Sequence, residues 1–476
     1  MSTKKLFINT MGCQMNVYDS GQIQNRLAPL GFEPTDDLTS ADIIMVNTCA
    51  IRAKAEQKAF SFLGRLTPFK ESKPELIIAI GGCVAQQEGH KILSRMPHVD
   101  LVFGTHAIRR LPQLIQRIAA TRCRIVDVEM AAAITSDDFA TGPITSSDVS
   151  AFVTIMRGCD NYCTYCVVPH VRGRESSRTP EEILTEIQHL VDHGVREVTL
   201  LGQNVNSYGQ KEGLCTFDQL LAMVNSIDGL ARIRFTTSHP KDLSEELMLA
   251  FNRLEKLCPH IHLPVQSGAD TVLRRMNRRY DIRRYLDNVA RLRAIRPDIA
   301  ITSDIIVGFP GETEEEFAAT LRLIQQVGFD GLFAFIYSDR PNAPAVRFEH
   351  KIDEALKKKR LQAVLSCQEA FTHRKNQSLT GSVQQILVDG LSKHLANGSE
   401  DRALPDASDG MQWSGRTGTN KIVHFVQEPS DDDRNQMLTG RIMEIMIEKA
   451  MSHSLWGRPL SQPDGSSGKG AHIYAA

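Results

Sequence analysis

Three cysteines lie close together near the middle of the chain, at Cys159, Cys163 and Cys166. The C-x-x-x-C-x-x-C spacing lets one loop present three thiolates to a single metal centre. Three protein ligands leave one iron of a four-iron cluster open, and an open metal position can bind a substrate. A structural zinc site with His170 as a fourth ligand is the alternative, but zinc ligands usually come as paired C-x-x-C or Cys/His units. The spacing therefore favours a catalytic iron–sulfur cluster.

Three other cysteines, Cys13, Cys49 and Cys83, are far apart in the sequence but share one setting. Each follows a short apolar segment, at residues 5–9, 42–46 and 76–80 respectively. Buried free thiols are the alternative, because unpaired cysteine is a common core residue. The carboxyl ends of parallel strands open on one edge of a sheet, so three thiols just beyond such ends can meet. We therefore predict a second three-cysteine site, which would hold a second cluster.

The elements that must position these cysteines follow a strand–helix rhythm in two regions. Over residues 4–120, Ile- and Val-rich runs separated by polar helical stretches predict an open parallel α/β sheet. Residues 131–149 lose this periodicity and predict a linker. The rhythm then resumes over residues 145–377, where Thr179 and Thr313 are expected to cap helices. Repeated units of this kind build a full or partial (β/α) barrel with its chemistry at the strand carboxyl ends.

The pattern changes again beyond residue 378. Short strands expected at residues 383–388, 421–425 and 441–447 predict a small all-β barrel over residues 378–446. Residues 447–476 are expected to form a disordered tail, Ser/Gly-rich from residue 461 to 470.

Composition sets the environment in which this chemistry would occur. No stretch approaches the roughly 20 apolar residues that cross a bilayer, and nothing near the start resembles a signal peptide. We therefore expect a cytoplasmic protein, in which metal binding rather than disulfides explains six of the ten cysteines, and Cys123, Cys215, Cys258 and Cys367 are ordinary thiols. The net charge of −1 gives no overall attraction to nucleic acid, so RNA contacts need local patches. The candidates are Arg172, Arg174, Arg178, Arg274, Arg275, Arg278 and Arg279, with a solvated charged face as the alternative.

The cysteine loop, following a strand expected at residues 152–156, resembles that of the radical S-adenosylmethionine (SAM) superfamily. Together with the N-terminal cysteines, the chain resembles the methylthiotransferase family over residues 4–446. Gly415, Arg416, Thr417, Lys421 and Phe425 are similar to the signature of that family's C-terminal TRAM domain. The other matching stretches are residues 12–16 (GCQMN), 162–169 (YCTYCVVP), 201–206 (LGQNVN), 234–240 (RFTTSHP), 262–268 (HLPVQSG) and 304–312 (DIIVGFPGE).

The resemblance implies an N-terminal α/β domain, a radical SAM core in the form of a partial barrel, and a TRAM barrel. It implies two 4Fe-4S clusters, on Cys13, Cys49 and Cys83 and on Cys159, Cys163 and Cys166. Reductive cleavage of SAM at the loop cluster would release a 5′-deoxyadenosyl radical. A second SAM would donate the methyl group, and sulfur would arrive through the N-terminal cluster. The expected reaction places a methylthio group on carbon 2 of N(6)-dimethylallyladenosine next to the anticodon of tRNA.

Polar residues near other expected strand ends are candidates for binding SAM. They are Gly202, Gln203, Ser238, Gln266 and Asp304, and their alternative role is turn formation and helix capping. We expect a monomer with tRNA and SAM as partners; the sequence does not identify the electron donor or the sulfur source.

Other functions remain open on the residues alone. Relatives within the family methylthiolate threonylcarbamoyl-adenosine in tRNA or an aspartate of a ribosomal protein, and a zinc-stabilised RNA-binding protein is the non-enzymatic alternative. Two departures from the family pattern are notable. His170 stands where tyrosine is frequent, and Asn342 replaces a glycine whose loss could alter a turn on the substrate side.

Overall fold

The chain divides into two units, Met1–Phe371 and Thr372–Ala476, and each is described by itself. The computed structural model describes residues 3–50, 53–131, 135, 149–392, 411–427 and 438–460. Most of the expected linker and the whole of residues 461–476 lie outside the described residues. Among the described residues, no helix combines the length and the apolar character that crossing a membrane requires.

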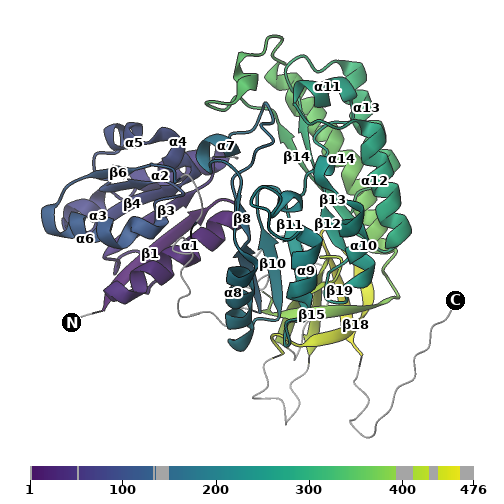
Figure 1. Ribbon diagram of the computed structural model, residues 1–476, viewed down its shortest axis with the longest axis horizontal. Helices are drawn as coiled ribbons and strands as arrows, with labels where there is room; N and C mark the ends of the chain where they lie inside the picture. Colours follow the sequence, from purple (N-terminus) through teal and green to yellow (C-terminus); the bar gives the residue numbers. More distant parts are fainter. Residues whose placement is uncertain are drawn as a thin grey trace, which may run out of the picture. The chain divides into compact units, whose positions relative to one another are not determined.

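The first part of unit 1 is a six-stranded sheet in the order β2-β1-β3-β4-β5-β6, with every pairing parallel. Helices cover both faces (Figure 1), and β3 and β4 are accordingly buried along their whole length. The elements are β1 (Lys4–Met11), α1 (Gln14–Leu27), β2 (Phe32–Pro34), β3 (Ile43–Thr48), α2 (Ala53–Gly64), α3 (Thr67–Ser72), β4 (Ile77–Gly82), α4 (Cys83–Glu88), α5 (His90–Arg95), β5 (Leu101–Phe103), α6 (Leu111–Thr121) and β6 (Ile125–Asp127). The parallel sheet expected from the sequence is confirmed, and it continues to Asp127.

The second part of unit 1 contains two three-stranded parallel sheets, β11-β10-β7 and β12-β13-β14. An isolated parallel bridge between Ile233 and Leu257 continues the first sheet toward the second, which gives a partial barrel. The elements are β7 (Ser150–Thr154), β8 (Met156–Arg157), α7 (Val168–Val171), β9 (Ser176–Ser177), α8 (Pro180–Asp192), β10 (Glu197–Leu201), α9 (Phe217–Asn225), β11 (Arg232–Thr236), α10 (Glu245–Arg253), β12 (His260–His262), α11 (Asp270–Arg275), α12 (Ile282–Ile295), β13 (Ala300–Val307), α13 (Glu314–Val327), β14 (Gly331–Ile336) and α14 (Glu354–Gln377), which runs into unit 2.

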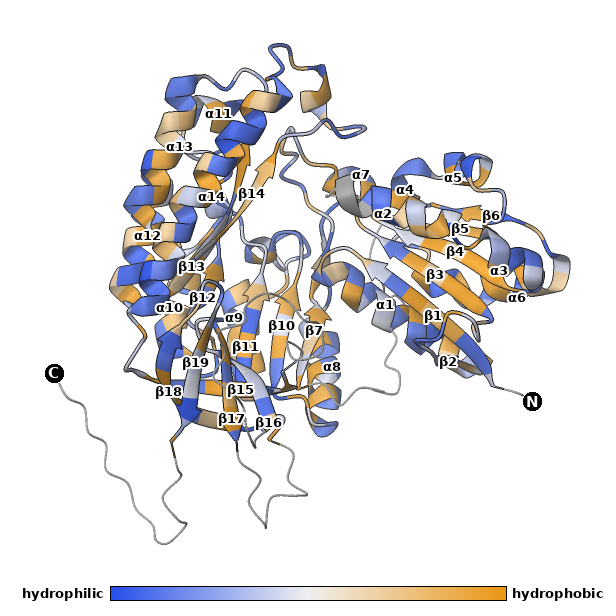
Figure 2. Cartoon of the chain, turned by 180° about the vertical axis from the view of Figure 1, so that it is seen from behind, coloured by the Kyte–Doolittle hydropathy of each residue, from blue (hydrophilic) through white to orange (hydrophobic). Residues whose placement is uncertain are grey.

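Local signals in the sequence explain where the barrel helices begin and end. Thr179 accepts a hydrogen bond from the Glu182 amide at the start of α8, and Thr313 accepts one from the Glu316 amide at the start of α13. Gly328 ends α13 with a φ of 57°. The strands of both sheets are largely hydrophobic in Figure 2, whereas the helices are hydrophobic on one side and polar on the other. The helix starts predicted at Thr179 and Thr313 are confirmed by these hydrogen bonds.

Unit 2 contains a closed five-stranded barrel in the order β15-β16-β17-β19-β18. Its strands are β15 (Val383–Leu391), β16 (Met411–Thr417), β17 (Ile422–Gln427), β18 (Ile442–Ala450) and β19 (Ser454–Pro459). Phe425 is fully buried in its core. The expected boundary at residue 446 needs correction, because β19 pairs with both β17 and β18 and closes the barrel. The barrel is consistent with a TRAM domain.

Candidate active site: two three-cysteine sites

The loop that carries Cys159, Cys163 and Cys166 leaves the barrel at β8 and returns at β9. These two short strands pair antiparallel, Met156 with Ser177 and Arg157 with Ser176, and so close the base of the loop. The Cys166 amide donates to the Cys163 carbonyl at 3.0 Å, which folds the loop back on itself. The loop is thus a rigid support for its three thiols rather than an open segment.

The thiols of this loop lie in surroundings that oppose negative charge. Burial raises the pKa of Cys159 to about 11 and that of Cys166 to about 12. The nearby Cys163 thiol raises both pKa values further. Arg278 Nη1 lies 3.5 Å from Cys163 Sγ. Three neighbouring thiols whose thiolate forms are disfavoured by burial fit an iron cluster, whose metal ions would supply compensating positive charge.

The other three cysteines follow the carboxyl ends of β1, β3 and β4, as the sequence predicts. Cys49 and Cys83 come directly after their strands, and Cys13 comes two residues after β1. The strand ends are joined by hydrogen bonds, from the Cys49 amide to the Met11 carbonyl at 3.1 Å and from Thr48 Oγ1 to the Gly81 carbonyl at 2.8 Å. A Cβ added to Gly12 would lie 2.9 Å from Cys49 Cβ, so only glycine permits this approach.

A pair of buried asparagines holds the Cys13 segment against the Cys49 segment. Asn16 Nδ2 donates to Asn47 Oδ1 at 3.0 Å, and Asn47 Nδ2 donates back to the Asn16 carbonyl at 2.8 Å. Asn16 Oδ1 also accepts from the Cys13 amide at 3.3 Å. Both asparagines are almost fully buried, so their mutual hydrogen bonds are needed to satisfy them. The pair fixes the relative positions of two of the three cysteines.

At the N-terminal site the thiols of Cys13 and Cys83 differ, because the pKa of Cys13 is lowered and that of Cys83 is raised. A hydrogen bond from the Cys49 side chain lowers the pKa of Cys13 to about 6, and the charge of Arg172 contributes in the same direction. Burial raises the pKa of Cys83, whereas Arg172 opposes that rise. No three metal-binding side chains among the described residues converge on one single-ion position. A four-iron cluster would not need such a position, because each cysteine would bind a different iron.

The helices that follow the two cysteine sites are joined by a buried ion pair. α1 begins after Cys13 and carries Asp19, and α7 follows Cys166 and ends just before Arg172. Arg172 Nη2 donates to Asp19 Oδ2 at 2.8 Å, with both side chains almost fully buried. The ion pair joins side-chain atoms only, so the link between α1 and α7 through Asp19 and Arg172 depends on these two side chains.

Two further contacts tie the N-terminal sheet to the barrel. Tyr18 Oη donates to Glu186 Oε1 at 3.2 Å, and Glu186 in turn accepts from the buried Arg178. Val167, directly before α7, and Val171, its last residue, pack in one hydrophobic cluster with Cys83 and Val84 of α4. The two cysteine sites are therefore held on one packed support within unit 1.

The structure corrects part of the RNA-binding hypothesis. Arg172, Arg178 and Arg278 are buried and bound to protein groups, so they are not available to phosphates. Arg275 pairs with Glu316 at 2.8 Å. Arg174 is exposed and pairs with Asp160, the residue after Cys159. Sequence reasoning treated all seven arginines alike because it could not identify their acidic partners.

The candidate SAM-binding residues lie around the carboxyl edge of the barrel, with one exception. Gly202 and Gln203 follow β10, and Gln203 Oε1 accepts from the Gly158 amide at 2.5 Å, which ties that strand end to the cysteine loop. Gln266 follows β12 and has a φ of 74°. Asp304 lies inside β13 rather than at its end, with Oδ1 3.5 Å from His262 Nε2.

Ser238 is the candidate with a buried hydroxyl that lacks a hydrogen-bond partner among the described residues. It follows β11, its side chain is 3% exposed, and its Oγ makes no hydrogen bond with the described residues. A buried hydroxyl without a partner costs free energy unless a ligand satisfies it. Ser238 is therefore the candidate whose geometry most favours a ligand contact.

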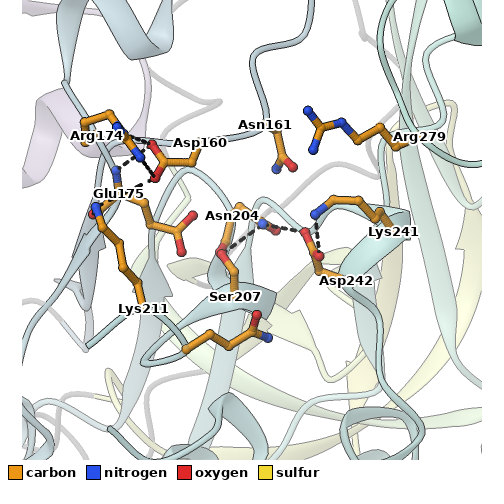
Figure 3. Close-up of a pocket in the computed structure, with 11 residues that line it drawn as sticks. Asp160, Asn161, Arg174, Glu175, Asn204, Ser207, Lys211, Lys241, Asp242 and Arg279 are labelled. Carbon is orange, nitrogen blue, oxygen red and sulfur yellow. Dashed lines mark hydrogen bonds and ion pairs between the residues drawn. The ribbon is translucent and has the colours of Figure 1, made fainter. Parts of the chain in front are cut away.

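A polar pocket of about 370 Å³ lies beside the cysteine loop, at the ends of β10 and β11 (Figure 3). Glu175 and Ser207 point into it, and Asn204 donates to Asp242 Oδ2 at 2.8 Å. Burial raises the pKa of Glu175 to about 7. Sequence reasoning did not identify Glu175, since an isolated carboxylate carries no spacing signal. The pocket is lined by Asp160, Asn161, Arg174, Glu175, Asn204, Ser207, Gln210, Lys211, Lys241, Asp242 and Arg279.

The departure at Asn342 causes no backbone conflict. Asn342 has a φ of 70°, in the left-handed region that glycine favours and that asparagine tolerates better than most residues. The neighbouring Ala343 packs with Val167 and Val171 against the N-terminal sheet. Asn342 therefore adopts a glycine-like backbone conformation at this turn.

The two halves of unit 1 match two known families. Residues 5–104 match the uncharacterized protein family UPF0004, and residues 153–324 match the radical SAM superfamily. The fold also resembles TsrM from Kitasatospora setae, a radical SAM methyltransferase solved with a tryptophan substrate and a SAM analogue. The TM-score is 0.55 at 12% identity, covering 81% of this chain and 78% of that one. The site and the fold define a radical SAM enzyme with an N-terminal UPF0004 domain.

Relatives that match over nearly the whole chain identify one family within the radical SAM enzymes. The chain is 53% identical over 469 residues to the tRNA-2-methylthio-N(6)-dimethylallyladenosine synthase of Desulfosudis oleivorans, covering 98% of this chain and 99% of the relative. It is 47% identical over 463 residues to the enzyme of the same name from Syntrophus aciditrophicus, covering 97% and 96%. The chain belongs to the tRNA-2-methylthio-N(6)-dimethylallyladenosine synthase family of radical SAM methylthiotransferases. It therefore uses SAM and iron–sulfur chemistry.

Proposed function

We propose that this chain converts N(6)-dimethylallyladenosine, next to the anticodon of tRNA, into its 2-methylthio derivative. The observation that carries the proposal is the near-complete match to synthases of that name. In the part of the chain that the structure describes, no feature favours threonylcarbamoyl-adenosine or a ribosomal-protein aspartate as the substrate. Because the chain matches the radical SAM superfamily and UPF0004, its cysteines are better explained as iron–sulfur ligands than as zinc ligands of an RNA-binding protein. A cytoplasmic location follows from a tRNA substrate.

The chain is proposed to hold two 4Fe-4S clusters. Cys159, Cys163 and Cys166 would bind one, and Cys13, Cys49 and Cys83 the other. When bound, the loop cluster supplies the electron that cleaves SAM and so generates the radical that removes hydrogen from carbon 2 of the adenine. The β8–β9 pairing and the Gln203 hydrogen bond hold the loop in place for this step.

The chain's own residues would divide the remaining tasks. Ser238, with its unpartnered buried hydroxyl, is proposed to bind SAM together with Gly202, Gln203, Gln266 and Asp304. The Asn16–Asn47 pair would hold the N-terminal thiols where sulfur is delivered. The Asp19–Arg172 and Tyr18–Glu186 contacts would keep the two sites at a fixed separation during the reaction.

The proposed domains are residues 4–127, 149–377 and 378–460, with the last strand included in the barrel. We propose that the enzyme acts as a monomer, because both cysteine sites lie in one unit of one chain.

The experiment is complementation of a bacterial strain that lacks its own enzyme of this kind. Mass spectrometry of digested tRNA would show the methylthio-prenyl adenosine restored by the wild-type chain. Restoration of a methylthio-threonylcarbamoyl adenosine instead, or of no methylthio nucleoside, would refute the substrate assignment. Anaerobic reconstitution provides the cluster test, with more than about six irons per chain expected for two clusters.

A further inference from the structure

The sheet formed by β12, β13 and β14 has one packed face and one exposed face. Along β13, Ile301 and Ile305 are buried in the hydrophobic core that this sheet forms with the surrounding helices, whereas Asp304 and Ile306 are only partly buried. Successive side chains of a strand point to opposite faces, so Asp304 and Ile306 lie on the face that is turned toward the inside of the barrel. We call this the inner face. The inside of a complete (β/α) barrel is filled by packed side chains, so exposed side chains on the inner face indicate a place for a ligand.

Three side chains form a row across the inner face, at His262 of β12, Asp304 of β13 and Phe333 of β14. Asp304 and Phe333 are paired in register, and the rings of His262 and Phe333 lie with their centroids 6.0 Å apart at 72°. Phe333 is 54% exposed, although Leu332 and Ala334 on either side of it pack against the hydrophobic core. Ligand sites typically combine aromatic surface with a few polar groups, and these three residues, which we call the inner row, have that composition.

The inner row lies close to the loop that carries the barrel cysteines. Tyr165, between Cys163 and Cys166, belongs to the same hydrophobic cluster as Ile306. Ile306 is two residues beyond Asp304 on the inner face of β13. Two residues of a strand span about 7 Å, so the inner row is roughly that far along the sheet from the place where the loop covers it.

The opposite side of the barrel adjoins the N-terminal cysteine site. Phe152 of β7 and Leu201 of β10 lie in one hydrophobic cluster with Cys13 and with Met15 of α1. Phe152 is on the inner side of its strand, because the neighbouring Val153 packs outward in the core that the sheets form with the helices. A base held against the inner row would therefore lie inside the barrel between the two cysteine sites, which is where the transfer of sulfur to carbon 2 requires it.

We propose that Phe333 determines substrate specificity by contacting the dimethylallyl group of the target adenine. The inference rests on the proposed function, because it takes the prenylated base as the substrate. The dimethylallyl group is a branched apolar chain, and covering it with the exposed ring of Phe333 removes apolar surface of both from water. A threonylcarbamoyl group carries a carboxylate instead, which the carboxylate of Asp304 beside Phe333 would repel. The inner row thus favours an apolar substituent and disfavours an acidic one.

The test is RNA binding by the full chain after anaerobic reconstitution of its clusters. Three RNA hairpins with the sequence of an anticodon stem and loop carry dimethylallyladenosine, threonylcarbamoyladenosine or adenosine at the position next to the anticodon. Fluorescence anisotropy gives the dissociation constant of each hairpin, and equilibrium dialysis gives that of SAM. The variants are Phe333→Ala and Phe333→Leu. Met223→Ala, which removes another exposed apolar side chain, on the barrel helix α9, is the matched control.

We expect the wild-type chain to bind the dimethylallyl hairpin about tenfold or more tightly than the adenosine hairpin, because the alkyl chain is buried on binding. Phe333→Ala should reduce this preference to less than about threefold and leave the dissociation constants of the adenosine hairpin and of SAM within about twofold of wild type. Phe333→Leu keeps an apolar side chain and should retain a preference of about fivefold. Since the Phe333 side chain is exposed, its removal leaves no core cavity, and Met223→Ala should match wild type throughout.

An unchanged preference in Phe333→Ala, or equal weakening of the dimethylallyl and adenosine hairpins, overturns the inference. A higher dissociation constant for SAM with the hairpin preference retained assigns the inner row to SAM and overturns it as well. These results leave the proposed function intact, because that function is decided by the nucleoside that the wild-type chain forms in the complementation experiment. A wild-type chain that prefers the threonylcarbamoyl hairpin and forms its methylthio derivative would overturn both proposals.

Discussion

Both cysteine sites bring three thiols together, but one uses a single loop and the other uses the ends of three strands. In the barrel, one loop brings three thiols together, and burial holds the pKa of Cys159 and Cys166 near 11 and 12. In the N-terminal domain, three strand ends bring the thiols together, and the pKa of Cys13 falls to about 6. The loop can be recognised from its spacing alone, whereas the dispersed site exists only because the sheet is parallel. The difference indicates that the two sites surround their thiols differently: burial disfavours the thiolates of Cys159 and Cys166, whereas the hydrogen bond from Cys49 favours the thiolate of Cys13.

Replacing the cysteines should give the largest effect. It tests whether the loop site cleaves SAM while the N-terminal site inserts sulfur. Alanine at Cys159, Cys163 or Cys166 should reduce deoxyadenosine formation to below about 1% of wild type, because the cofactor that cleaves SAM is lost. Alanine at Cys13, Cys49 or Cys83 should spare cleavage and stop sulfur insertion. Chromatography of deoxyadenosine and mass spectrometry of tRNA nucleosides measure the two activities. Identical behaviour of both sets would contradict the distinction between the sites.

Each site also has a glycine directly before a cysteine, and changing these glycines should disable one site at a time. A Cβ on Gly82, at φ 89°, would lie 2.4 Å from the Thr48 carbonyl, and one on Gly158, at φ 77°, would lie 2.0 Å from that of Arg174. We expect Gly82→Ala and Gly158→Ala each to cost roughly 1–3 kcal/mol of stability and to lose about half of the bound iron, at the N-terminal and loop sites respectively.

Iron analysis and deoxyadenosine formation distinguish the two glycine variants. Gly21→Ala is the control, because that glycine lies within α1 with no atom near its added Cβ. It should keep full iron content and gain slightly in stability. Loss of deoxyadenosine formation in Gly82→Ala would show that the sites are not independent.

Ser238→Ala should weaken SAM binding without touching the N-terminal site. Because Ser238 Oγ has no partner in the described residues, removing it sacrifices no hydrogen bond of the folded chain. The dissociation constant for SAM, measured by equilibrium dialysis, should rise about 3- to 10-fold, the usual value of one neutral hydrogen bond. Ser226→Ala, at the outer end of α9, is the matched control. An unchanged SAM affinity with lower thermal stability would mean that Ser238 is structural.

Glu175→Gln tests whether the surroundings of the loop site disfavour negative charge in general. Its pKa is raised to about 7 by burial, so the folded state is favoured below its ordinary value of 4.5 and loses that advantage as pH rises toward 7. Glu175→Gln should therefore raise the free energy of unfolding by about 1–2 kcal/mol at pH 8 relative to its effect at pH 5. Urea unfolding at the two pH values measures this, and a pH-independent effect would contradict it.

Much of the fold was accessible from local sequence signals. Short Ile- and Val-rich runs located β1, β3 and β4, and Thr179 and Thr313 located two helix starts, because these features depend on neighbouring residues only. β19 was not predicted, since residues 454–459 combine a Gly, a Pro and a Trp with no alternation. Its strand character comes from closing the barrel between β17 and β18.

The functional site could be predicted from the sequence only in part, because some of its contacts join residues that are far apart in the chain. Spacing and strand ends identify all six cysteines, but the ion pair between Asp19 and Arg172 joins residues more than 150 positions apart in the chain. Nothing in a charge run distinguishes Arg172, which is buried, from Arg174, which is exposed two residues later. The burial of each arginine and the identity of its acidic partner depend on tertiary contacts, so only the structure shows them.

The start of α1 at Cys13 has one more consequence. The peptide dipoles of a helix add to roughly half a positive charge at its N-terminus. α1 runs from Gln14 to Leu27, and hydrogen bonds from the backbone of Met15 and Asn16 favour the Cys13 thiolate. The first turn of this helix therefore acts as a built-in counter-charge for sulfur, present in the folded chain before any iron is loaded.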